Sequence, residues 1–433
     1  MIDLEKRAAA IFSLLTEKGY SIKLFGFSAL DKYLSLAPLP FLRIKTNADI
    51  SVLAKFFENL RYPGVEIANA AADFGGEPRP GLSAGYGGEA RLATCKWSDE
   101  AAEPGITYYF YCEDGEEKDP MPLNSFTYDL KSGHFQDPLD LYETGLFPLK
   151  KKHGGRKAEQ SSLKEFSHEV FFNSIDAPND IVFAHNLVMD VSLFISRYDL
   201  ETDPQDYINM LAPVLPLLEA GTLPLCEAQR IFLTSIMVSP RPDRGLNLLK
   251  HSGFLEKLWP EIAAYDKVDH SKEFHPEGNV WEHTMETFRY RKPGAGGAFD
   301  LCLSLGLLLH DAGKPVSASF GNRRFDGHAE LGARAAERFL KRLEFSPSLI
   351  NDIYFLVRNH MLPAALKRLP LVKTKEIMSS HLFPTLMELY RCDESSSFKG
   401  LGGYYENSAA YQTYLKNNRN PYRSANGKKT GRG

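Results

Sequence analysis

The stretch LCLSLGLLLHDAGKP, residues 301–315, ends an apolar run on a histidine and an aspartate. The run LSLGLLL predicts a buried helix, because it consists almost entirely of apolar residues. His310 and Asp311 follow it directly and require partners, because burying an unpaired charge is costly. A metal ion would satisfy both side chains. The alternative is a helix-terminal pair in which His310 and Asp311 hydrogen-bond to each other.

Further candidate ligands lie on both sides of this stretch. In chain order, the candidate metal ligands are His283, His310, Asp311, His328, His360 and Asp393. Imidazole nitrogens and carboxylate oxygens together suit a hydrolytic divalent metal, because they can hold one or two ions and leave a position for water. The sequence therefore predicts one or two divalent ions, of manganese, nickel, iron, magnesium or zinc.

Helix signals place several of these ligands at helix ends. Asn279 is a predicted N-cap for the helix that carries His283. His328 opens a second predicted helix, and His360 closes a third that starts at Ser346-Pro347. Ligands at the ends of several helices can converge on one point without strain. Taken singly, His328 and His360 could equally be ordinary histidines, and Asp393 could equally cap a helix.

Five stretches between about residues 275 and 395 carry a resemblance: HPEGNVWEHTM, LLLHDAGKP, FDGHAELGARAAERFL, VRNHM and YRCDESS. They resemble an HD-type metal-dependent phosphohydrolase domain. The resemblance implies His283 as first ligand, His310 and Asp311 as the central pair and Asp393 as the closing ligand, with His328 and His360 available for a second metal. Asp311 would hold or bridge the metal as a catalytic residue. Lys314 would be the catalytic contact to phosphate, as a point charge beside the pair.

Composition limits the class of protein. A chain of 433 residues with 43% hydrophobic residues can form several domains. A net charge of -4 argues against a surface that binds polyanions throughout, so contact with nucleic acid must be local. Five cysteines without a CxxC pair fit a reducing compartment. The N-terminus is unlike a signal peptide and the longest apolar run is too short for a bilayer, so we expect a cytoplasmic protein without membrane contact.

The pattern of predicted elements changes near residue 150. Before it, the expected helices are 4–18, one from about residue 29, and 52–60, and the expected strands are 21–27, 89–97, 106–113 and 125–130. Beyond residue 160, the expected helices preceding the metal ligands are 166–175, 180–198, 204–221 and 227–238. We therefore predict an α+β fold with a small mixed-sheet head (1–150), an all-α neck (160–265), an all-α HD domain (266–400) and a basic disordered tail (415–433).

The head and neck carry a second resemblance. The stretches FGFSALDKYL, FLRIKTNADI, PLNSFTYDLKSGHFQDPLDLYETGLF, EAQRIFLTSI and GLNLLKHSGFLEKLWPEI are similar to the tRNA nucleotidyltransferase and poly(A) polymerase family, whose members often carry a C-terminal HD domain. This resemblance implies a nucleotidyltransferase-like head and possible binding of tRNA or another RNA by the neck.

The head departs from that family at its charged positions. Nucleotidyl transfer needs carboxylates to hold Mg²⁺ ions, yet the positions of the family's DxD motif fall on Phe41 and Arg43. The glycine pair survives only as Gly26-Phe27, and the arginine expected after it is Leu30, although Asp31 remains. These substitutions predict a head that no longer catalyses transfer.

The resulting prediction is a metal-dependent phosphohydrolase whose substrate is a nucleotide or RNA-end phosphomonoester or phosphodiester. In it the HD domain is active and the head is inactive. Two alternatives remain open: an active tRNA nucleotidyltransferase of the CCA-adding type, and a non-enzymatic RNA-binding protein.

Overall fold

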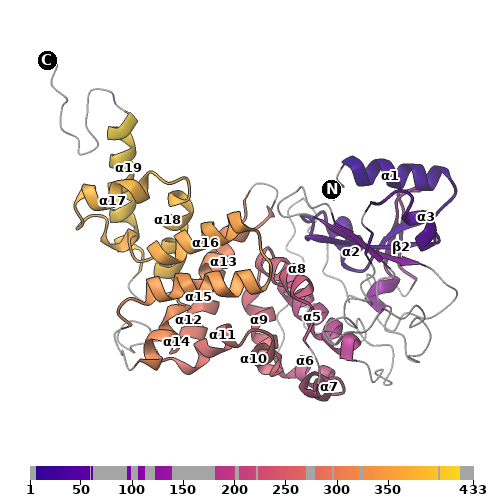
Figure 1. Ribbon diagram of the computed structural model, residues 1–433, viewed down its shortest axis with the longest axis horizontal. Coiled ribbons are helices and arrows are strands. Elements are labelled where there is room, and N and C mark those ends of the chain that lie inside the picture. Colours follow the sequence, from indigo (N-terminus) through magenta and orange to yellow (C-terminus); the bar gives the residue numbers. More distant parts are fainter. Residues whose placement is uncertain are drawn as a thin grey trace, which may run out of the picture. The chain divides into compact units, whose positions relative to one another are not determined.

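The computed structural model describes most of the chain, namely residues 6–58, 60–61, 95–98, 106–112, 122–138, 181–199, 204–220, 223–269, 278–294, 297–320, 325–397 and 400–419. The chain divides into two compact units. The first unit comprises Met1–Pro240 with Asn247–Ser252 and Ala295–Ala298, and the second comprises Arg241–Leu246, Gly253–Gly294 and Phe299–Gly433. Figure 1 shows strands in the first unit and helices throughout the second.

The first unit holds a mixed six-stranded sheet with the strand order β3-β4-β2-β1-β5-β6. Its strands are β1 (Ile22–Phe25), β2 (Phe41–Thr46), β3 (Cys95–Ser98), β4 (Thr107–Cys112), β5 (Thr127–Asp129) and β6 (Phe135–Gln136). Its helical elements are α1 (Lys6–Glu17), α2 (Phe27–Leu34), α3 (Ile50–Leu53), η1 (Pro122–Ser125), α5 (Ile181–Arg197), α6 (Pro204–Leu211), α7 (Leu215–Ala220) and α8 (Cys226–Met237). The mixed sheet arises because β2 pairs parallel with β4 but antiparallel with β1. The predicted α+β class is confirmed.

One face of this sheet is apolar and is covered by α1. Ile44 of β2 pairs with Phe110 of β4, and both side chains are buried. Phe12 of α1 contacts the rings of Tyr108 and Phe110 at 5.9 and 6.3 Å. Alternation along β4 therefore buries Tyr108 and Phe110 in the core.

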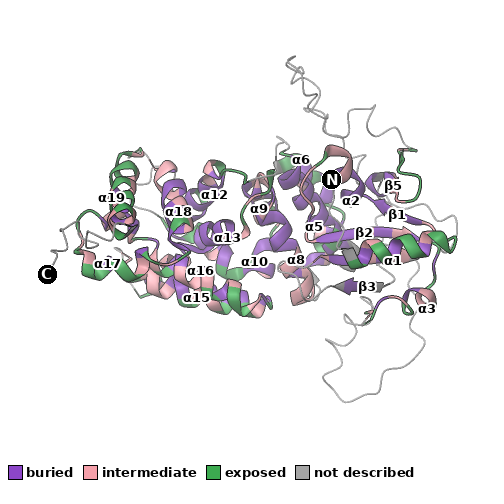
Figure 2. Ribbon diagram, turned by 90° about the horizontal axis from the view of Figure 1, so that it is seen from above, coloured by how far each residue is buried: buried purple, intermediate pink, exposed green. Residues whose placement is uncertain are grey.

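The second unit is helical. Its elements are α10 (Phe254–Leu258), α11 (Pro260–Ala263), η3 (Ala264–Lys267), α12 (Val280–Thr287), η4 (Phe288–Tyr290), α13 (Leu301–Leu309), α14 (Gly313–Ser319), α15 (His328–Arg342), α16 (Pro347–Asn359), η6 (Pro363–Ala365), α17 (Leu371–Met378), α18 (Phe383–Ser395) and α19 (Gly402–Arg419). The helix α9 (Pro242–His251) spans the division between the units. Figure 2 shows α13 as a buried helix, which confirms the prediction for residues 301–309.

The packing around α13 fixes the end of the apolar run. Gly306 lets the helix approach its neighbours, because an added Cβ would lie 3.0 Å from Leu356 of α16 and 3.0 Å from Leu389 of α18. The hydroxyl of Tyr265 donates to the main-chain oxygen of Leu308 at 3.1 Å, inside the core. His310 follows as the C-cap of this rigidly held helix.

Two predicted helices differ from those observed. The helix expected over 52–60 is limited to α3, and the chain continues in turns up to residue 58. The helix expected over 204–221 is broken into α6 and α7 around Pro213, because proline lacks the N–H that an uninterrupted helix requires. The helix expected over 166–175 lies outside the described residues.

The predicted tail and the expected absence of membrane contact can each be compared with the described part of the chain. Residues 415–419 of the predicted basic tail belong to α19, and residues 420–433 lie outside the described part. Within the described ranges, no helix combines the length and the apolar character that crossing a bilayer requires.

Candidate metal centre

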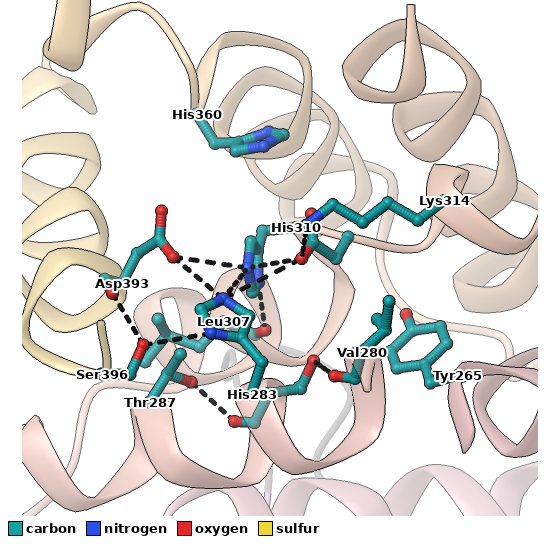
Figure 3. Close-up of polar contacts among 12 residues, drawn as sticks. Tyr265, Val280, His283, Thr287, Leu307, His310, Lys314, His360, Asp393 and Ser396 are labelled. Atoms are coloured by element: carbon teal, nitrogen blue, oxygen red, sulfur yellow. Dashed lines mark hydrogen bonds and ion pairs between the residues drawn. The ribbon is translucent and has the colours of Figure 1, made fainter. Parts of the chain in front are cut away.

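The six predicted ligands converge inside the second unit, although they come from five helical segments. Helix α12 supplies His283, the end of α13 supplies His310 and Asp311, the start of α15 supplies His328, the end of α16 supplies His360, and α18 supplies Asp393. The predicted caps are also present, since the side chains of Asn279 and Ser346 accept hydrogen bonds from the first turns of α12 and α16. Figure 3 shows several of these side chains pointing toward one another.

We call His283, His310 and Asp393 the first group. Their ligand atoms lie within 4.8 Å of one another. His283 Nε2 lies 3.0 Å from Asp393 Oδ1 and 3.4 Å from His310 Nε2 (Figure 3). The distance from His310 Nε2 to Asp393 Oδ1 is 3.9 Å. Two imidazoles and one carboxylate thus present their donor atoms to a common point.

We call Asp311, His328 and His360 the second group, which satisfies the same 4.8 Å limit. His328 Nε2 lies 3.1 Å from His360 Nε2 and 3.7 Å from Asp311 Oδ1. The other carboxylate oxygen, Asp311 Oδ2, lies 3.3 Å from His310 Nε2 of the first group. Asp311 therefore stands between the groups with one oxygen toward each.

The backbone orients three of the four imidazoles. His310 Nδ1 lies 2.7 Å from the oxygen of Leu307, and His360 Nδ1 lies 2.7 Å from the oxygen of Val357. His328 Nδ1 lies 2.8 Å from the oxygen of Phe325. A carbonyl oxygen only accepts, so each Nδ1 carries a proton, and in the neutral ring Nε2 keeps its lone pair toward the centre. This is the neutral tautomer that a metal ligand requires.

Burial and charge act on the ligands in opposite directions. Burial lowers the pKa of His360 to about 4 and also lowers the pKa of His328, so both are neutral at pH 7. Burial by itself raises the pKa of Asp311, but the nearby charges of His310 and Lys314 outweigh it and hold that pKa well below its usual range. The pKa of Asp393 is also lowered, since hydrogen bonding and charge from His283 exceed the effect of burial. The centre thus combines ionised carboxylates with neutral imidazoles at His328 and His360.

Lys314 of α14 lies beside Asp311. Its Nζ lies 2.6 Å from Asp311 Oδ2, and its side chain is largely buried at 12% exposure. The ammonium group therefore places one fixed positive charge at the edge of the donor cluster.

The donor set fits divalent metal ions. Four imidazoles and two carboxylates are hard or intermediate donors, and the buried carboxylate of Asp311 faces both groups with a separate oxygen. Within the described residues, these two groups are the only ones whose donors could hold an ion.

Two residues that position the centre were missed by sequence reasoning. Ser396 contacts His283 Nδ1 through its hydroxyl at 3.2 Å. Gly313 lies where α14 crosses α15, and an added Cβ would fall 1.9 Å from the main-chain oxygen of His328. Serine runs and isolated glycines are common in sequence, so neither residue carries a signal until the helices are packed.

The positions of the family's DxD motif lie on the sheet face opposite α1. Phe41 is buried, and Arg43 forms a two-point ion pair with Asp190 of α5, at 2.9 and 2.7 Å. Beside it, Lys96 Nζ of β3 lies 2.7 Å from Glu227 Oε2 of α8. The structure thus places cations of the sheet against carboxylates of the helices on this face.

The retained aspartate of α2 is also engaged by α5. Asp31 accepts hydrogen bonds from Arg197 at 3.1 Å and from the hydroxyl of Tyr198 at 3.0 Å. Arg197 also donates to the oxygen of Ala37. Burial raises the pKa of Asp31, and the charge of Arg197 opposes that shift. Asp31 therefore joins α2 to α5 in a buried network. Arg91 and residues 118–120, which stand where the family has a third carboxylate and an Arg-Arg-Asp motif, lie outside the described residues.

Comparison with known families adds a decisive observation for the second unit. Residues 280–389 match the family model of the HD domain. They form an HD domain. The match spans five of the six candidate ligands, and Asp393 lies just beyond its end. The predicted presence of an HD domain near the C-terminus is confirmed.

Curated relatives of the chain are tRNA nucleotidyltransferases, as the second resemblance predicts. A "CC-adding tRNA nucleotidyltransferase" of Thermus thermophilus is 32% identical over 200 residues, 42% of this chain and 44% of that protein. An "A-adding tRNA nucleotidyltransferase" of Deinococcus radiodurans is 30% identical over 40% of each chain. A "Multifunctional CCA protein" of Halorhodospira halophila is 32% identical over 34% of this chain and 35% of that protein. The chain thus matches less than half the length of each of these relatives.

Solved structures similar to the chain include the Bacillus stearothermophilus CCA-adding enzyme in complex with CTP. That similarity has a TM-score of 0.47 at 13% identity and covers 95% of this chain and 82% of the other. The Thermotoga maritima CCA-adding enzyme complexed with tRNA has a TM-score of 0.38 at 12% identity and covers 96% of this chain and 84% of the other.

These relatives correct the predicted function. The prediction of a phosphohydrolase with an active HD domain and an inactive head is wrong, because relatives of the chain are named as CC-adding and A-adding tRNA nucleotidyltransferases. The prediction gave most weight to the six metal ligands of the HD domain, and such ligands do not by themselves specify hydrolysis.

Proposed function

We propose that this chain is a tRNA nucleotidyltransferase that adds C or A nucleotides to tRNA. The observation that carries the proposal is the similarity to the CC-adding enzyme of Thermus thermophilus and the A-adding enzyme of Deinococcus radiodurans. tRNA and a nucleoside triphosphate are then the substrates, and Mg²⁺ is the expected cofactor of the transfer step.

The described part of the first unit sets a requirement on this proposal. Transfer needs carboxylates that hold metal ions beside the triphosphate, and β2 offers Phe41 and Arg43 at the family positions. The catalytic carboxylates must therefore come from other parts of the chain. Glu66, Asp73 and Glu89 lie in the segment 62–94, outside the described residues, and are the first candidates to test.

The test is incubation of the full-length protein with Mg²⁺, labelled CTP or ATP, and tRNA transcripts that end before the CCA sequence, after one C, or after both. Incorporation into one or more transcripts is the expected result. A Glu66→Gln, Asp73→Asn, Glu89→Gln triple variant should lose incorporation if those carboxylates hold the metal. Absence of incorporation with every transcript and nucleotide would overturn the proposal.

A second candidate function is tRNA binding without nucleotide addition. The buried ion pair between Arg43 and Asp190 favours this second function. Arg43 is a cation on β2 at a position where the family has a metal-binding carboxylate. The same preparation should then shift labelled tRNA in a binding assay without extending it. Failure both to bind and to extend tRNA would exclude the two candidates together.

We also propose that the HD domain holds one or two divalent ions. His283, His310 and Asp393 would hold one ion, His328 and His360 would hold the other, and Asp311 would share its oxygens between them. Such ions bind phosphate oxygens, and Lys314 adds a positive charge for the same phosphate. The roles predicted for Asp311 and Lys314 therefore become holding the ions and contacting an RNA or nucleotide phosphate.

Elemental analysis of protein purified without chelator tests this centre and identifies the metal. One or two ions per chain are expected, and a combined His310→Ala, Asp311→Ala variant should lose them, because it removes one ligand from each group. Full metal content in that variant would show that the ions lie elsewhere.

A further inference from the structure

Ser396 holds one histidine of the candidate metal centre in a way that differs from the other three. The hydroxyl of Ser396 lies 3.2 Å from His283 Nδ1 and donates to the main-chain oxygen of Asp393 at 2.7 Å (Figure 3). His310, His328 and His360 are held by main-chain oxygens instead. Of the four imidazoles, His283 is thus the one whose Nδ1 contacts a side chain.

The proton arrangement around Ser396 follows from these contacts. Because its hydroxyl hydrogen points to the oxygen of Asp393, the hydroxyl oxygen is free to accept the hydrogen of His283 Nδ1. Nε2 lies 3.0 Å from Asp393 Oδ1 in the first group and shares a hydrogen with it. When an ion replaces that hydrogen, a proton kept on Nδ1 leaves the lone pair of Nε2 for the ion. Ser396 therefore favours the tautomer of His283 that can bind a metal.

Ser396 also joins two ligands of one group. It is the C-cap of α18, and Asp393 lies three residues before it on the same last turn. Both nitrogens of His283 thus contact this turn, Nδ1 through Ser396 and Nε2 through Asp393. Ser396 is buried at 9% exposure, so water does not readily replace its hydroxyl.

We infer that Ser396 is a positioning residue that sets the tautomer and the orientation of His283 and thereby the affinity of the first group for a divalent ion. This inference rests on the proposed metal centre. Partners of a ligating histidine typically change metal affinity by about 10- to 100-fold when they are removed. Among the described residues, the hydroxyl of Ser396 contacts His283 and Asp393, both of the first group, so its removal should weaken one ion selectively.

The test compares four full-length proteins: the wild type, Ser396→Ala, Ser396→Thr and Ser397→Ala. The matched control is Ser397, whose hydroxyl donates to the oxygen of Glu394 at 2.9 Å with the same spacing of three residues. Calorimetric titration with Mn²⁺ should give a dissociation constant for one ion raised about tenfold or more in Ser396→Ala. Ser396→Thr, which keeps the hydroxyl, and Ser397→Ala should remain close to the wild type.

A second measurement separates positioning from general damage. The ring ¹⁵N signals of His283 in the Zn²⁺-loaded protein should show a protonated Nδ1 in the wild type and in Ser396→Thr. In Ser396→Ala they should show a mixture of two ring orientations, with the ion bound through Nε2 in one and through Nδ1 in the other. The signals of His328 and His360 should be unchanged.

The outcomes distinguish the role of Ser396 from the proposed metal centre and the proposed nucleotide addition. A wild type that binds no divalent ion would overturn the metal centre and the role of Ser396 together. Metal binding by Ser396→Ala that equals that of Ser397→Ala, or equal losses in Ser396→Ala and Ser396→Thr, would overturn the role of Ser396 alone. Nucleotide addition to tRNA is measured separately, so its absence leaves this result interpretable.

Discussion

Single atoms decide how the ligands of the HD domain face one another. Asp311 directs one oxygen to each group, and main-chain oxygens fix the tautomers of His310, His328 and His360. The convergence of these six side chains could be predicted from sequence, because histidine and aspartate are distinctive donors. Their positioning residues could not, because Ser396 and Gly313 gain their roles only from contacts between helices that are distant in sequence.

Gly313 offers a direct test of such positioning. In Gly313→Ala, the added Cβ would lie 1.9 Å from the oxygen of His328 and 2.6 Å from the nitrogen of Gly332, so the backbones of α14 and α15 must separate. Overpacking of this kind costs about 1–3 kcal/mol of stability. We expect a lower melting temperature and weaker binding of the ion held by His328, measured by calorimetry.

A glycine elsewhere in the same unit is the control for that variant. An added Cβ at Gly402, the first residue of α19, would meet nothing within 4 Å, so Gly402→Ala should bind metal as the wild type does. Equal metal affinity in Gly313→Ala and Gly402→Ala would show that the close crossing does not position His328.

At the level of elements, local signals predicted the helices of the HD domain well. Asn279 and Ser346 cap α12 and α16 as expected, because capping depends on the residue itself and on the next few positions. The hydrophobic pattern over 204–221 continues through Pro213 and predicts one helix, whereas Pro213 divides α6 from α7. Charged contacts between elements were not predictable, since Asp190 lies 147 residues from Arg43.

The ion pair between β2 and α5 should be essential to the stability of the first unit. Arg43 and Asp190 have exposures of only 14% and 8%, so Arg43→Met leaves a buried carboxylate without its partner. Breaking a buried pair typically costs about 3–5 kcal/mol, whereas replacing both partners with apolar residues is often neutral. Denaturant unfolding should therefore show a large loss in Arg43→Met and recovery in a combined Arg43→Met, Asp190→Leu variant.

An exposed ion pair provides the comparison. Lys341 and Glu337 of α15 lie one helical turn apart, with exposures of 63% and 36%. Pairs of this type contribute about 0.3–0.5 kcal/mol, so Lys341→Met should change unfolding very little. If Arg43→Met were as mild as Lys341→Met, the pair between β2 and α5 would not hold the sheet to its helices.

For the whole molecule, division into two compact units predicts an uneven response to metal. An ion that binds only the folded HD domain stabilises it by about 2.7 kcal/mol at a hundredfold excess over the dissociation constant. In scanning calorimetry, Mn²⁺ should raise the unfolding temperature of the second unit and leave that of the first unit unchanged. A chelator should reverse the shift. Equal movement of both transitions, or of neither, would contradict this prediction.

The distance in sequence between paired charges in the first unit also bears on how the protein is made. Asp31 meets Arg197 across 166 residues, and Lys96 meets Glu227 across 131. The amino-terminal strands thus leave the ribosome long before the helices that carry their ion-pair partners have been translated. Contacts between residues so far apart in sequence form slowly. The charged groups and apolar surface of the amino-terminal strands therefore stay uncovered until those helices have been synthesised.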